Sequence, residues 1–120
     1  MNILDYIPIG HKNAISRETL AAITQLSDRK LRDLISGINQ NDDDSQIIVN
    51  LQDGKGYFRP AEDEDNLVLA WDKIGDSRYK NYRRNASSGE RYLRWKNHKQ
   101  KQRENKLDGQ MDIFDFLKGG

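Results

Sequence analysis

Residues 20–35 read LAAITQLSDRKLRDLI, and the spacing of the apolar side chains in this stretch predicts two helices. Ser16 and Ser27 each stand where a helix cap is favoured, the first before residues 17–24 and the second before residues 28–38. The apolar positions of the second run follow the i, i+3, i+4, i+7 spacing of one helical face: Leu31, Leu34, Ile35 and Ile38. We therefore predict two helices joined by a three-residue turn.

Packing considerations favour a close crossing of these helices. Ala21 is small enough to let the second helix approach, and Leu26 is placed to fill the space under the turn. Leu31 and Leu34 are expected to anchor the second helix. The polar run 39–45, rich in Asn and Asp, should end that helix.

A hairpin is predicted directly afterwards. The β-branched run 47–51 and the run 57–59 flank residues 52–56, which contain Asp-Gly and a second Gly. Pro60 should close the second strand because it has no N–H to donate.

The order of helix, turn, helix and glycine-tipped hairpin resembles the winged helix-turn-helix superfamily. Residues 7–60 also resemble the N-terminal module of small phage and prophage replication or regulatory proteins, some of them called replisome organisers. Gln25 stands where many such motifs have Gly. We expect a mainly α fold with a small β-hairpin: a winged helix-turn-helix domain over residues 1–60, then a C-terminal helical extension and a flexible tail.

The resemblance implies that residues 28–38 form a recognition helix for the major groove of DNA. Lys55 at the wing tip and Arg17 at the start of the first helix are expected to contact phosphate. The recognition helix and its start supply the other candidates: Ser27, Arg29, Lys30, Arg32, Asp33 and Ser36. However, residues 1–60 carry seven basic and eight acidic side chains, a net charge of −1, which favours the alternative of a protein-binding domain.

The remaining charge is strongly segregated. In the segment 61–86, residues 62–65 are all acidic, which favours a helix start there. A helix that packs on the domain is predicted by the spacing of Leu67, Trp71, Ile74, Arg78 and Tyr82. From 78 to 106 there are eleven basic residues against Glu90 and Glu104, a net charge of +9. For the segment 87–109 we predict phosphate contacts by these basic side chains: Arg91, Arg94, Lys96, Lys99, Lys101 and Arg103. The alternative is a solvated helix.

Residues 110–120 form the predicted tail after Gly109. Its sequence Gln110-Met111-Asp112-Ile113-Phe114 resembles the pentapeptide by which bacterial polymerases and repair proteins dock on the sliding clamp. That resemblance implies that Gln110 enters a polar pocket and that Ile113 and Phe114 enter an apolar groove. The alternative is a terminal amphipathic helix that packs back on the domain.

Several functions are disfavoured by the composition. The chain of 120 residues has no Cys, two His and no apolar run long enough for a membrane span. We expect no enzymatic activity, no cofactor, no metal site and a soluble cytoplasmic protein. We expect a DNA-binding protein of phage or prophage type that acts in replication or its regulation, with double-stranded DNA and the sliding clamp as partners and a homodimer left open. The alternative is an adaptor or inhibitor of a host factor that does not bind DNA specifically.

Overall fold

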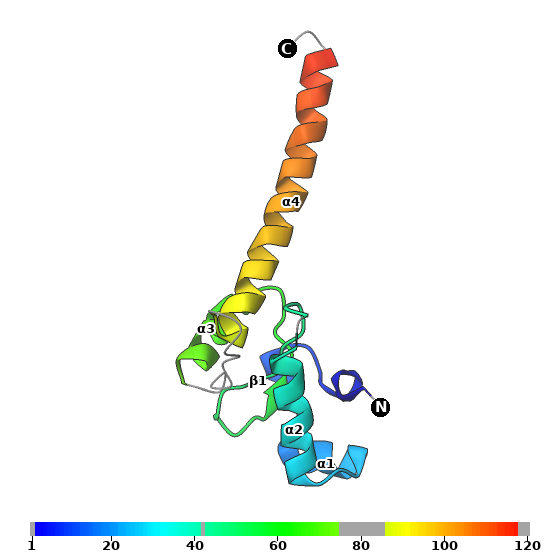
Figure 1. Ribbon diagram of the computed structural model, residues 1–120, viewed down its shortest axis with the longest axis vertical. Helices are drawn as coiled ribbons and strands as arrows, with labels where there is room; N and C mark the ends of the chain where they lie inside the picture. Colours follow the sequence, from blue (N-terminus) through cyan, green and yellow to red (C-terminus); the bar gives the residue numbers. More distant parts are fainter. Residues whose placement is uncertain (1, 42, 75–85, 118–120) are drawn as a thin grey trace.

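The computed structural model describes residues 2–41, 43–74 and 86–117, with side chains up to residue 103. A body of short helices and one hairpin carries a long C-terminal helix that points away from it (Figure 1). The longest extent of the molecule is 65 Å, against 31 and 27 Å in the other two directions. In the part of the chain that the structure describes, no helix has the length and apolar character needed to span a membrane.

The predicted helix pair is confirmed. After the 3-10 helices η1 (Ile3–Tyr6) and η2 (His11–Asn13), α1 spans Arg17–Thr24 and α2 spans Asp28–Asn39. The hydroxyl oxygens of Ser16 and Ser27 accept hydrogen bonds from the N–H groups of Thr19 and Lys30, both at 3.1 Å. These side chains satisfy N–H groups that the first turn of a helix leaves without a partner.

Gln25 explains how the turn is made without the usual glycine. Its backbone is left-handed, with φ of +58°, and its N–H donates to the carbonyl of Ala21. An L-residue pays about 1 kcal/mol or more in this region of backbone space. The turn therefore has the geometry for which other sequences use Gly.

The predicted hairpin is also confirmed, with shorter strands. Strands β1 (Val49–Asn50) and β2 (Tyr57–Phe58) are antiparallel, and Val49 lies opposite Phe58. Ile15 bridges the other edge of β2 through two backbone hydrogen bonds with Tyr57, of 2.9 and 2.8 Å. At Gly56 a Cβ would lie 2.0 Å from the carbonyl oxygen of Ile15, so only glycine fits there.

The hairpin is buried on both faces, and each face belongs to a different hydrophobic core. Ile48 and Tyr57 join the first core, with residues of η1, α1 and α2 such as Leu20 and Leu31. The alternate positions Ile47, Val49 and Phe58 join the second core. Side chains of a strand alternate between its faces, so this β-branched run covers both cores at once.

Helix α3 (Asp65–Lys73) and helix α4 (Ser88–Leu117) complete the second core through Val68, Trp71 and Tyr92. Helix α3 is shorter than the predicted 61–86 helix. Trp71 is buried as predicted, but Ile74 lies at the end of α3 with 51% of its surface exposed. Of the predicted stripe, Arg78 and Tyr82 lie outside the described residues.

The backbone of α4 runs past Gly109, where we predicted the start of the tail. Helix α4 contains 30 residues and continues through Gly109 to Leu117, where we expected a separate tail. A glycine inside a helix costs only about 1 kcal/mol relative to alanine, and no proline is present to stop the helix. Helix α4 begins at the sequence Ser87-Ser88-Gly89, where the Ser87 hydroxyl accepts from the N–H of Glu90 at 3.3 Å.

One predicted anchor of α2 needs correction, which gives a test of the fold. Leu31 is fully buried, whereas Leu34 is only partly buried and Ile35 takes the second core position. Leu31→Ala should lower the free energy of unfolding by about 2–5 kcal/mol, because it leaves a cavity between the helices. Leu34→Ala should lower the free energy of unfolding by about 1 kcal/mol, because folding removes less apolar surface from water at Leu34 than at Leu31. Urea unfolding measures both, and equal losses would contradict this assignment.

Candidate nucleic-acid interface

Helix α2 has one buried face and one charged face. Leu31 and Ile35 point into the first core, while Ser36 is half-buried at the border of the charged face. The charged face exposes four of the predicted contact residues: Arg29, Lys30, Arg32 and Asp33. No ion pair joins Arg29 or Lys30 to any residue whose side chain the structure describes. These two cations are therefore the ones on α2 that remain available to a ligand.

Asp28 joins α1 to α2 by holding two arginines. Its two carboxylate oxygens contact Arg17 Nε at 2.9 Å and Arg32 Nη2 at 3.1 Å. All three side chains are about half exposed, so water screens these pairs and they contribute little stability. Their effect is geometric: two predicted phosphate contacts from different helices are brought side by side, with a net charge of +1.

The wing tip is attached to the N-terminal segment. Lys55 is exposed at the tip, as predicted. Beside it, Asp53 accepts from the Lys55 N–H at 3.1 Å, and its other oxygen lies 2.6 Å from His11 Nε2. Burial acts to raise the pKa of Asp53, but the bonds from Lys55 and His11 outweigh it and hold this pKa below its usual value. These contacts fix the position at which the wing presents Lys55.

Arg91 is buried, whereas the predicted contact with phosphate requires an exposed side chain. Its side chain is 7% exposed, and its guanidinium donates to the carbonyl of Asn39 at 2.8 Å and to that of Asn41 at 3.1 Å. The same group pairs with Asp44 at 3.1 Å. A cation at the end of α2 is favoured by the carbonyl groups that the last helical turn leaves without partners. Arg91 is a buried structural anchor.

Lys96 is likewise buried, with 9% exposure, so its predicted contact with phosphate is also wrong. Its ammonium pairs with Asp65 at 2.6 Å and donates to the carbonyl of Glu62. Burial acts to lower the pKa of Lys96, but the bond to Asp65 outweighs it and raises this pKa above its usual value. Lys96 therefore ties α4 to the start of α3.

The other basic residues predicted on this segment are exposed on α4: Arg94, Lys99, Lys101 and Arg103. The Lys99 ammonium lies 5.5 Å from the centre of the Trp95 ring, within the range of a cation–π interaction. Helix α4 leaves the body at the end opposite α1 (Figure 1), so these charges do not extend the patch on α2.

The clamp-like residues 110–114 have a described backbone within α4. The side chains of Gln110, Met111, Asp112, Ile113 and Phe114 lie outside the described part of the chain.

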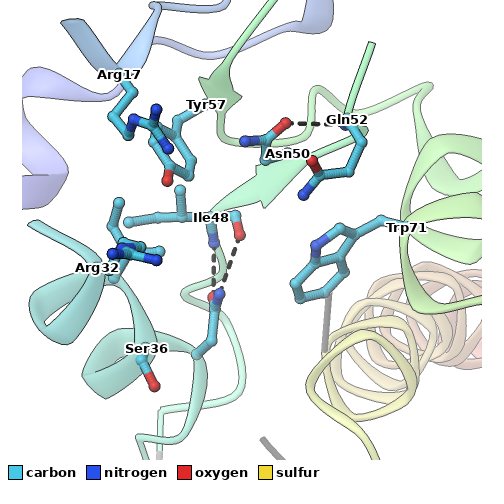
Figure 2. Close-up of a pocket in the computed structure, with 10 residues that line it drawn as sticks. Arg17, Arg32, Ser36, Ile48, Asn50, Gln52, Tyr57 and Trp71 are labelled. Carbon is cyan, nitrogen blue, oxygen red and sulfur yellow. Dashed lines mark hydrogen bonds between the residues drawn. The ribbon is translucent and has the colours of Figure 1, made fainter. Parts of the chain in front are cut away.

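A pocket between α2 and the hairpin was not predicted. Figure 2 shows Arg17 and Arg32 on its helical side and Asn50, Gln52 and Trp71 on the other. No local motif unites these residues, since they come from α1, α2, the hairpin and α3. The polar residues Asn50, at the end of the first hairpin strand, and Gln52, just after it, were the signal available in the sequence.

Comparison of the chain with models of protein families, with curated proteins and with solved structures gave no match.

The two arginines of the first turns of α4 provide a matched test. Arg91→Ala should lower the free energy of unfolding by about 3 kcal/mol, because it leaves buried carbonyl groups without a donor. Arg94→Ala should change it by less than about 0.5 kcal/mol, because Arg94 is 72% exposed. Thermal or urea unfolding of both variants checks this. A stable Arg91→Ala protein with weakened DNA binding would reverse the assignment.

Proposed function

We propose that this protein binds double-stranded DNA without enzymatic activity, using the charged face of α2 and the wing. The observation that carries the proposal is that Arg29 and Lys30 are exposed beside the capped start of α2, free of ion pairs among the described side chains. Their helix is held by its opposite face against the core. Such a helix can enter the major groove while its anchors stay buried.

The other basic side chains fit a supporting role. Arg17 and Arg32, oriented by Asp28, and Lys55 at the wing tip would contact phosphates on either side of the groove. The four exposed cations of α4 would contact a separate stretch of backbone and release counterions without reading sequence. By its resemblance to replisome organisers, the protein would act in phage or prophage DNA replication or its regulation in the cytoplasm.

A salt series with matched variants tests this function. Duplex affinity should fall steeply as salt rises. Changing Arg29 and Lys30 together to Ala should weaken binding at least about tenfold, with unfolding unchanged, because both are exposed. Changing Arg94, Lys99, Lys101 and Arg103 to Gln should flatten the slope of log affinity against log salt. Lys12→Gln, which also removes an exposed positive charge, is the control.

Absence of duplex binding at low salt would refute the proposal. It would favour the adaptor function, for which the net charge of −1 over residues 1–60 is the supporting observation.

We further propose that residues 110–114 dock on the bacterial sliding clamp. The supporting observation is the sequence match at Gln110, Asp112 and Phe114 with conservative changes between them. The backbone of this stretch belongs to the last turns of α4, so docking in an extended form requires those turns to unwind. The ends of helices fray, so the cost of unwinding the last turns of α4 is small.

The full-length protein tests the tail directly. Titration with purified sliding clamp should show micromolar binding that is lost when Ile113 and Phe114 are both changed to Ala, because a few buried anchors dominate such interfaces. Lys106→Ala and Lys118→Ala, on either side of the motif, are controls and should retain the binding. Equal binding by parent and double variant, or none by either, would contradict clamp docking.

A further inference from the structure

The pocket between α2 and the hairpin has a volume of about 280 Å³ and two chemically different ends (Figure 2). One end carries the Arg17 and Arg32 guanidiniums. The other carries the amide groups of Asn50 and Gln52 and the indole of Trp71. Ile48 separates the two ends, so a ligand that uses both must be charged at one end and flat or polar at the other.

The arginine end suits an anion. Each guanidinium places one nitrogen within 3.1 Å of Asp28, and no other contact this close joins either group to a side chain that the structure describes. The remaining N–H groups can therefore donate to a ligand, and their planar arrangement matches phosphate oxygens. Burial raises the pKa of the neighbouring Tyr57, so its hydroxyl stays protonated and does not repel an anion.

The opposite end suits a nucleobase. The Asn50 side-chain oxygen accepts from the Gln52 N–H at 2.9 Å, which orients the amide. Side-chain amides both donate and accept, as do the edges of bases. The amide of Asn39, which also lines the pocket, donates to the carbonyl of Ile48 at 3.1 Å and accepts from the Ile48 N–H at 2.8 Å.

We propose that this pocket binds a single nucleotide, with its phosphate on Arg17 and Arg32 and its base against Asn50 and Gln52, beside the wall that the buried Trp71 forms. The volume is that of about nine water molecules, enough for one heterocycle and too small for a stacked pair. The nucleotide is either free or an unpaired unit of a single strand. Arg29 and Lys30 are not part of this site, whereas Arg17 and Arg32 are shared with the proposed phosphate contacts of the duplex.

Trp71 provides the readout. The chain has two Trp residues, so Trp95→Phe leaves Trp71 as the single tryptophan. In this background we would titrate dAMP, dGMP, dCMP and TMP, the matching nucleosides and inorganic phosphate, by calorimetry and by Trp71 fluorescence. At least one nucleotide should bind saturably and at least about tenfold more tightly than phosphate or its own nucleoside, because only it uses both ends.

Variants of each end then locate the site. Arg32→Gln and Asn50→Leu should each weaken nucleotide binding about tenfold, whereas Lys12→Gln should leave it unchanged. Ser36→Phe, at the half-buried pocket wall, should block binding by filling the space and is a second test should Asn50→Leu fail to fold. Thermal unfolding verifies that each variant is folded.

Titration with a five-nucleotide single strand distinguishes a free nucleotide from an unpaired nucleotide of a single strand. Tighter binding of the strand than of the free nucleotide, lost in Asn50→Leu, supports an unpaired base, whereas preference for the free nucleotide supports a free ligand. The proposal is overturned by absence of saturable binding, by phosphate binding as tightly as every nucleotide, or by nucleotide binding that survives both Asn50→Leu and Ser36→Phe. Duplex binding is measured separately, so its failure is distinguishable.

Discussion

The structure depends on the junction at Asn39, where α2 ends. Its side chain accepts from the N–H of Ile48 and donates to the carbonyl of Ile48. These two bonds hold α2 to the start of the hairpin. Its own carbonyl accepts from Arg91 and from the Ser88 hydroxyl, which binds the same point to α4. Because these groups are buried, each unmade bond would carry the full cost of desolvation. One residue thus sets the relation of three elements.

That junction also determines which basic residues can meet a ligand. The +9 segment is not a uniform cationic surface. Arg91 donates to a carbonyl group at the end of α2, and Lys96 pairs with a carboxylate at the start of α3. Among the residues of this segment whose side chains the structure describes, 86–103, the basic positions that face away from these contacts, such as Arg94 and Lys99, are exposed. A charge count along the sequence therefore overestimates the cationic surface of the first turns of α4.

The two-sided hairpin explains why a pocket forms beside α2. One face of the hairpin packs on the first core through Ile48 and Tyr57, and the other packs on the second core with Trp71. The pocket opens where these two cores meet, lined by residues from both. Polar Asn50 and Gln52 follow the buried part of the strand, so the space between the cores has polar walls on the hairpin side.

By itself the sequence determined the helix pair, its caps and the hairpin, because these depend on residues that are close together in the chain. The caps join Ser16 to Thr19 and Ser27 to Lys30, and the hairpin turns at the glycines of residues 52–56. It also placed the exposed charges of α2 correctly. Tertiary structure alone decided that Arg91 and Lys96 are buried, that Ile35 replaces Leu34 as the second anchor, and that Arg17, Arg32 and Asn50 share a pocket. The reason is physical: burial, hydrogen bonding and ion pairing join residues that are 9 to 52 positions apart, and no local spacing encodes which of them meet.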